Sequence, residues 1–316
     1  MRHLFIQLTH VAALTLVAAL LASGGCAKPA STREPLVTFD RPEDAVAALV
    51  AAVEKHDRTE LARLLGAGSE PLLSSGDPVA DSTEREAFLV RYRAKNSLVA
   101  GSLDDVVLQV GEDDWPLPIP IVRHNGRWHL DGAAGADEIV MRRIGANELR
   151  TIDVMHGFVA AEQDYAADPH DGGTAGAYAQ LLRSESGKHN GLYWKVAQGE
   201  PQSPAGPMLA AASAEGYSGA QERGEPYHGY HFRMLTSQGP AAMGGARDYL
   251  MNGRLTGGFA LLAWPASYGA SGVMTFMVNQ DGIVWQRDLG FETADLAAAI
   301  KTFDPDSTWL PIAPEQ

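Results

Sequence analysis

The chain has 316 residues, of which 39 are acidic and 25 are basic, so its formal net charge at pH 7 is −14. A surface this acidic repels nucleic acid and anionic lipid headgroups, which excludes a DNA- or RNA-binding protein. The single cysteine, Cys26, leaves no partner for a disulfide and excludes a cysteine-ligated zinc or iron–sulfur centre. The length suits one large domain or two ordinary ones, held together by packing alone.

The first 26 residues have the layout of a bacterial export signal. A weakly basic start precedes an almost unbroken run of Ala, Val and Leu from Val11 to Ala22, and Ser23-Gly-Gly-Cys26 follows. This run is shorter than the roughly 20 apolar residues that span a membrane. We therefore predict a signal peptide over residues 1–26, with a lipobox-like cysteine, Cys26, as the lipidation site.

A second interpretation stays open, because Ser23 stands where a lipobox usually has leucine. Ordinary cleavage between Ala22 and Ala30 would leave a soluble periplasmic protein. The residue after Cys26 is Ala27 rather than Asp. By resemblance to the sorting rule of Gram-negative bacteria, this residue indicates the outer membrane. The expected location is therefore the periplasmic face of a membrane, the outer one by this rule, with attachment by a lipid anchor.

Residues 27–37 are polar and contain prolines, as is typical of a tether, and residues 38–137 form the first predicted domain. Three helices are expected there, over residues 42–53, 57–65 and 83–92. A small antiparallel sheet should follow, with a strand at 106–110 and a hairpin around Asn125-Gly126. This order resembles the cone-shaped fold of nuclear transport factor 2, through residues 41–50, 57–65 and 121–131.

Residues 138–316 form the second predicted domain, in which one long helix packs on an antiparallel meander. The helix should begin at Glu138, because apolar residues repeat every three or four positions as far as Ala166. Shorter elements follow: a helix at 208–215, strands at 228–235, 258–264, 273–278 and 283–287, and a last helix from Thr293 to Phe303. The predicted fold class is α+β.

The second domain resembles the globular half of type IV pilins and pseudopilins. The helix-to-loop passage over residues 147–180 carries this resemblance, as do Tyr230-His-Phe-Arg, Ala263-Trp-Pro-Ala and residues 272–284. A pilin has its apolar helix and processing site directly before this unit, and here another domain stands in that place. The resemblance therefore implies the fold, and a pseudopilin-like assembly subunit remains an alternative function.

Across most of its length the chain resembles a bacterial exported family known as domain of unknown function family 2950. The blocks that carry this resemblance are Leu73-Ser-Ser-Gly-Asp-Pro-Val-Ala-Asp, Trp115-Pro-Leu-Pro-Ile-Pro, Arg142-Arg-Ile-Gly-Ala-Asn-Glu-Leu, Gly191-Leu-Tyr-Trp, Pro226-Tyr-His-Gly-Tyr-His-Phe-Arg and Phe303-Asp-Pro-Asp-Ser-Thr-Trp. The resemblance implies an exported bacterial protein, and it implies no reaction.

Motifs for catalysis, metals or cofactors are absent from the sequence, so no catalytic residue, metal or cofactor is predicted. The ten histidines form no His-Glu-x-x-His, and no Gly-x-Ser-x-Gly or phosphate loop occurs. His124 and His129 flank a hairpin turn and should face solvent. Glu162 and Asp164 lie two residues apart on the long helix and should be solvated charges.

Aromatic residues beside Gly and Pro are the best candidates for a ligand site. They either fill the seams between short strands or line a groove, and the possible groove consists of Tyr193, Trp194, Tyr227 and His228. The predicted function is a non-catalytic lipoprotein of the cell envelope with a binding or structural role, whose partner is an envelope protein or polymer. The alternative enzyme is a hydrolase of an envelope polymer, which would bring titratable residues with shifted pKa values into one pocket.

Overall fold

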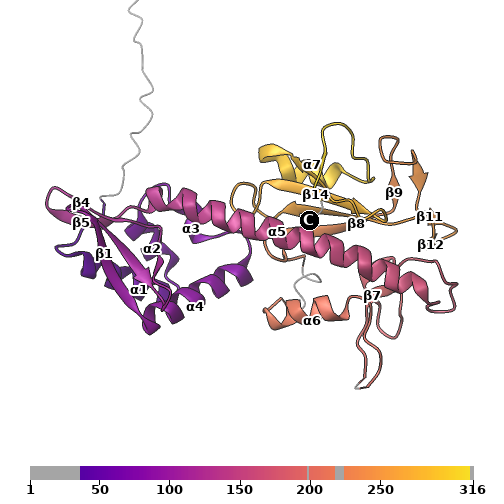
Figure 1. Ribbon diagram of the computed structural model, residues 1–316, viewed down its shortest axis with the longest axis horizontal. Coiled ribbons are helices and arrows are strands. Elements are labelled where there is room, and N and C mark those ends of the chain that lie inside the picture. The colour runs from indigo at the N-terminus through magenta and orange to yellow at the C-terminus, as the bar shows by residue number, and fades with distance from the viewer. Residues whose placement is uncertain (1–35, 198, 218–223, 314–316) are drawn as a thin grey trace, which may run out of the picture. The chain divides into compact units, whose positions relative to one another are not determined.

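A computed structural model describes residues 36–197, 199–217 and 224–313 of the chain (Figure 1). Residues 34–316 form one compact unit, and the expected signal peptide, Cys26 and most of the tether lie outside the described residues. The described part combines helices with antiparallel sheets, so the fold class is α+β, as predicted. Within these ranges, no helix has both the length and the apolar character needed to cross a membrane.

Four helices open the described part, and side-chain caps set two of their starts. Their bounds are α1 Pro42–Glu54, α2 Arg58–Leu65, α3 Glu70–Leu73 and α4 Pro78–Ala94. Asp57 accepts a hydrogen bond from the Glu60 amide at 2.9 Å, which confirms the predicted capping box of α2. The third predicted helix, α4, begins at Pro78 rather than Thr83, because the Asp77 carboxylate caps its first amides. The short α3 was not predicted.

An antiparallel sheet follows, in the order β1-β2-β4-β5, with β3 paired to β2. The strands are β1 Asn96–Ser102, β2 Asp105–Val110, β3 Trp115–Pro116, β4 Ile121–His124 and β5 Arg127–Leu130. Asn125 and Gly126 have φ of 51° and 79°, the left-handed values that a two-residue hairpin turn requires, so the predicted hairpin is confirmed. The sequence Asn96–Ser102 shows no clear alternation, which is why β1 was not predicted.

The longest helix, α5, runs from Gly132 to Ala167 through both parts of the described chain (Figure 1). It begins six residues before the predicted start, because Asp131 caps the Ala134 amide at 3.0 Å. A Cβ on Gly135 would lie 2.7 Å from the Pro118 carbonyl oxygen, so glycine lets the first turn of α5 pack closely on the loop before β4. The expected domain boundary between residues 137 and 138 falls inside this helix.

A second antiparallel sheet, in the order β16-β15-β14-β13-β8, forms the centre of the later part. Its strands are β8 Tyr230–Leu235, β13 Ala260–Pro265, β14 Met274–Asn279, β15 Trp285–Asp288 and β16 Leu310–Pro311. Helix α5 covers one face and α7, Thr293–Ala299, covers the other. Leu261 and Phe276 pack toward α5, whereas Leu262 and Met277 pack toward α7. Both faces are therefore buried, and the predicted packing of a long helix on a meander is confirmed.

Shorter elements connect these layers. They are β6 Leu181–Arg183, β7 Gly191–Tyr193, α6 Gly206–Ala214, β9 Ser237–Gln238, β10 Arg247–Asp248, β11 Leu250–Met251, β12 Arg254–Leu255 and the 3-10 turn η2 Gly290–Glu292. Strand β8 begins two residues later than predicted, because His228 has φ of 49° and Gly229 has φ of 76°. Left-handed backbone at both positions cannot continue a strand.

Candidate functional site

A cavity of about 720 Å³ lies between α4 and α5, and its lining is completed by α1, α2, α3, the segment from β2 to Ile119, and residues Glu215, Tyr217 and His228. Most of its wall is apolar, because the helices turn their leucine and aromatic positions toward the first core. Representative wall residues are Leu49, Leu72, Phe88, Trp115, Leu117 and Ile139. Pockets of 300–1,000 Å³ with apolar walls and few polar groups are typical of small-molecule sites.

Five arginines line the same cavity, although the chain as a whole is strongly acidic. They come from α4 and α5 only, and they are Arg85, Arg91, Arg142, Arg143 and Arg150. The acidic residues of the lining are three, Asp81, Glu84 and Glu215. Three of the arginines have a carboxylate beside them: Asp113 lies beside Arg91, Glu138 beside Arg142 and Glu84 beside Arg143. Arginines thus outnumber acidic residues in the lining itself.

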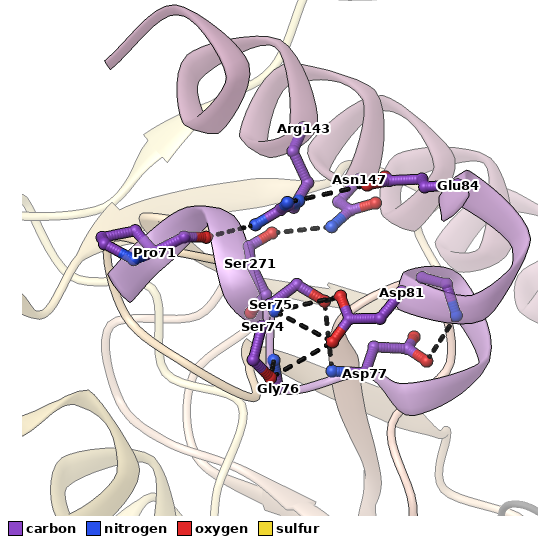
Figure 2. A network of polar contacts seen from close by, with 11 residues as sticks. Pro71, Ser74, Ser75, Gly76, Asp77, Asp81, Glu84, Arg143, Asn147 and Ser271 are labelled. Atoms are coloured by element: carbon purple, nitrogen blue, oxygen red, sulfur yellow. Dashed lines mark hydrogen bonds and ion pairs between the residues drawn. The ribbon is translucent and has the colours of Figure 1, made fainter. Parts of the chain in front are cut away.

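Arg143 is the most buried of these arginines, with 7% of its surface exposed. Its Nη1 donates to the Pro71 carbonyl oxygen at 2.9 Å, and its Nη2 lies 3.6 Å from a carboxylate oxygen of Glu84 (Figure 2). The third donor, Nε, is buried and has no hydrogen-bond partner. Burial raises the pKa of Glu84, and the positive charge of Arg143 opposes that rise. The guanidinium is thus fixed by two neighbours and keeps one buried donor free.

Arg85 shares this feature, since its Nε is also buried without a partner. Arg150 is exposed and makes no hydrogen bond or ion pair with another described residue. Arg91 and Arg142 lie on either side of the opening from α4 and α5, and their guanidinium carbons are 6.0 and 5.9 Å from the centre of the Trp115 ring. Cation–π contacts of this kind hold a tryptophan between two helices.

A polar network beside the cavity holds the start of α4 (Figure 2). The Asp81 carboxylate accepts hydrogen bonds from the hydroxyls of Ser74 and Ser75 and from the Ser75 amide. Asp77, which is fully buried, accepts from the Tyr217 hydroxyl at 3.0 Å and from the Gly229 amide at 2.8 Å. These bonds fix the segments around Tyr217 and Gly229 against the helix that forms one cavity wall.

Asn147 makes a second connection between the two parts, from α5 to the loop before β14 (Figure 2). Its side-chain amide donates to the Ser271 carbonyl oxygen at 3.0 Å, and both residues are buried. A Cβ on Gly229 would lie 2.6 Å from the Asn147 side-chain nitrogen, so only glycine fits there. The cavity wall is therefore held at both ends by buried hydrogen bonds.

His228 is the one residue of the predicted groove that lines this cavity. Its Nε2 lies 3.0 Å from a carboxylate oxygen of Glu215, and its ring packs 4.2 Å from the Tyr227 ring and 5.3 Å from the Tyr217 ring, between centroids. Burial lowers the pKa of His228, while the charge of Glu215 raises it. The pair forms a half-buried imidazole oriented by a carboxylate, which is suitable for hydrogen bonding or proton transfer.

The structure divides the predicted groove into two clusters. Tyr227 lies beside His228 and lines a smaller cavity of about 320 Å³. Trp194 instead packs on His189, with 4.3 Å between ring centroids, and Tyr193 lies under the guanidinium of Arg183 at 4.7 Å. Among the described residues, no ring contact joins the Tyr193–Trp194 pair to the Tyr227–His228 pair, so the four residues do not share one aromatic cluster.

The arginines of the cavity were missed by sequence reasoning. Arg85 and Arg143 are far apart in the chain, and nothing in the local pattern distinguishes them from solvated helix residues. The available signal was Arg142-Arg143 followed by Arg150 among apolar positions of one helix. A basic residue on an apolar helix face indicates a buried charge. That Arg85 of α4 lines the same cavity as Arg143 follows only from the tertiary fold.

Two predictions about titratable residues were wrong. Glu162 is fully buried rather than solvated, because it lies on the face of α5 that packs on the second core, and only Asp164 is exposed. Its Oε2 accepts from the Ala179 amide at 2.8 Å, its Oε1 has no partner, and burial raises its pKa to about 8. His129 is half-buried with a partnerless Nδ1, and burial lowers its pKa.

The part of the chain that the structure describes contains no group of three or more His, Cys, Asp or Glu side chains arranged to hold a metal ion. No curated protein and no solved structure matches the chain significantly. A family model described as "Protein of unknown function (DUF2950)" matches residues 37–312, which is most of the chain and includes every residue of the cavity. The chain therefore belongs to the DUF2950 family.

Proposed function

We propose that this protein is a non-catalytic, ligand-binding lipoprotein of the bacterial cell envelope, and that the cavity between α4 and α5 is its binding site. The observation that carries the proposal is Arg143, a buried guanidinium in the cavity wall with one donor unpaired. An unpaired donor on a buried charged group costs about 1–3 kcal/mol or more. An acidic ligand in the cavity would lie beside this buried positive charge and help to balance it.

The wall supports binding rather than a purely structural role. The cavity of about 720 Å³ is open to solvent and leaves apolar side chains of the first core accessible along its wall. The start of α4, which forms part of that wall, is held in place by buried bonds to Asp77. A preformed cavity reduces the entropy lost when a ligand binds.

The envelope location is supported by the sequence of residues 1–26 and by the lack of any other cysteine in the chain. Labelling of expressing cells with a palmitate analogue tests this part of the proposal. We expect label on the wild type and none on Cys26→Ser. Equal labelling of both, or no label on either, would contradict lipid anchoring.

A hydrolase is the second candidate, and the His228–Glu215 pair is the observation that favours it. His228 lines the cavity in a left-handed backbone conformation, which is enriched at functional sites. The pair could act as a general base oriented by a carboxylate. The two candidates differ in turnover, because a binding protein returns its ligand chemically unchanged.

Binding to the cavity can be tested with N-phenyl-1-naphthylamine, a neutral apolar fluorophore. We expect a saturable rise in fluorescence with a stoichiometry of one. Ala146→Trp, which places an indole in the cavity lining, should abolish this rise, whereas Ala160→Trp, at an exposed alanine of α5 outside the cavity, should not. Equal binding to the two variants at equal thermal stability would contradict the proposal, as would the absence of saturable binding.

A further inference from the structure

The geometry points to a single-chain amphipathic anion as the ligand of this cavity: an acidic headgroup bound by Arg85 and Arg143, with an apolar chain among the leucine and aromatic side chains of the wall. This inference rests on the proposed function and names the class of ligand. The headgroup chemistry is that of a carboxylate or a phosphate, and the two sources are separate arms of the test below.

The headgroup end follows from the donors that the fold leaves unused. Both Arg85 and Arg143 line the cavity, and in both the buried Nε has no hydrogen-bond partner. An arginine side chain has five N–H donors in a planar fork, which matches carboxylate and phosphate oxygens. A neutral headgroup would leave the positive charge of these two arginines unbalanced, and a cationic one would add repulsion.

The charge balance of the wall favours an anion as well. Five arginines and three acidic residues line the cavity. Arg91 and Arg142 also pair with Asp113 and Glu138, which are not part of the lining. Glu84, the acidic neighbour of Arg143, lies 3.6 Å away at its closest oxygen and is half exposed. The remaining acidic residues have other neighbours, since Asp81 accepts from Ser74 and Ser75, and Glu215 pairs with His228.

The apolar end is formed by the helices that meet in the first core. Leu49, Leu61, Leu72 and Leu117 come from four different segments, and Phe88 adds an aromatic face from α4. Burial of apolar area is worth about 25 cal/mol per Å², so an aliphatic chain gains affinity along its whole length. The volume of about 720 Å³ is within the range of pockets that enclose one small ligand, which favours one chain over two.

The test is displacement of N-phenyl-1-naphthylamine from the full chain by dodecyl compounds that differ only in the headgroup, each used below its micelle concentration. The compounds are dodecanoate, dodecyl phosphate, dodecanol and dodecyltrimethylammonium. We expect at least one of the two anions to displace the fluorophore about ten-fold more tightly than the alcohol, and the cation to be the weakest. A preference for dodecanoate indicates a fatty acid, and a preference for the phosphate indicates a phosphorylated lipid.

Substitutions locate the headgroup. Arg85→Gln and Arg143→Gln should each reduce anion affinity by about ten-fold and leave the affinity for dodecanol unchanged. Arg93→Gln is the matched control, because Arg93 lies on α4, pairs with Glu54 and does not line the cavity. Arg143→Gln also removes the bond to Pro71, so Arg85, which makes no hydrogen bond to another described residue, gives an independent test if Arg143→Gln fails to fold.

Two results separate this inference from the proposed function. If dodecanol and the cation displace the fluorophore as tightly as the anions, or if both arginine variants keep the full anion preference, the inference is wrong while the cavity remains a binding site. If the fluorophore does not bind, or if Ala146→Trp does not block it, the proposed function itself is wrong.

Discussion

The two cores of this protein border cavities of different size. Around the second sheet, large side chains such as Tyr230, Phe259 and Phe276 have no exposed surface, and the cavity beside Phe158 and Leu261 measures about 320 Å³. Around the first sheet, the helices bury Leu64 and Leu108 but leave a cavity of about 720 Å³ beside them.

This difference indicates that the two parts of the chain have different roles. A closely packed sheet with a long helix on one face gives a rigid frame, and α5 continues from that frame into the wall of the cavity. Arg143 and Arg150 therefore lie on the same helix as Phe158 and Glu162, two residues of the second core. A site supported by a rigid element keeps its geometry when it is empty.

The largest expected effect tests the packing difference. Phe276→Ala in the second core should lower the free energy of unfolding by about 3–5 kcal/mol, because it leaves a cavity in a filled region. Phe88→Ala, at a half-buried position that already faces the cavity, should cost no more than about 1.5 kcal/mol. Urea unfolding of both variants measures the losses, and equal losses would contradict the comparison.

The next effect concerns the one buried carboxyl of the frame with a strongly raised pKa. Because the pKa of Glu162 is raised to about 8 from a reference of 4.5, the folded state holds its proton more tightly than the unfolded chain does. The contribution of Glu162 to the free energy of unfolding should therefore be largest below about pH 4.5. It should fall as the pH rises to about 8. At 1.4 kcal/mol per pKa unit, this rise corresponds to a loss on the order of 5 kcal/mol.

Glu162→Gln should remove this fall, since the amide carries no charge and its oxygen can still accept from Ala179. Thermal unfolding between pH 5 and 9 measures the difference, with Asp164→Asn as the control at an exposed position on the same helix. A wild-type protein whose melting temperature does not fall relative to Glu162→Gln over this range would show that Glu162 is ionised throughout.

A smaller effect concerns the connection between frame and cavity. Asp77→Ala removes both the cap of α4 and the acceptor of Tyr217 and Gly229, and we expect a loss of about 2 kcal/mol. Asp57→Ala is the matched control, because Asp57 caps α2 and should cost only about 1 kcal/mol. Hydrogen exchange should also become faster at the start of α4 and around Gly229 in Asp77→Ala, and unchanged exchange there would contradict the connection.

Local sequence signals predicted several individual elements of the fold. Asn125-Gly126 gave the hairpin, Asp57 with Glu60 gave the cap of α2, and the apolar repeat gave most of α5. Asp77-Pro78 is a typical start signal for a helix, but the start of α4 was predicted later in the chain, at Thr83. The burial of Glu162 was also readable, since it is three residues after Val159 on the same helix face.

The cavity could not be predicted in the same way. Its wall combines α1 to α5 with the segment from β2 to Ile119, and its charged lining depends on which faces of α4 and α5 turn toward each other. Arg85 and Arg143 have ordinary helix neighbours in the sequence, and only the fold buries the Nε of each. Of the aromatic residues that the sequence favoured, Trp194 packs instead on His189, and Tyr193 lies under the guanidinium of Arg183.

Photocrosslinking with a diazirine-bearing dodecanoate, followed by peptide mapping of the full chain, tests most directly whether the cavity binds ligand. We expect adducts on the facing segments 80–91 of α4 and 139–150 of α5, and their loss in Ala146→Trp. Adducts confined to residues 189–194 or to the exposed ring of Phe291, with none on α4 or α5, would contradict it.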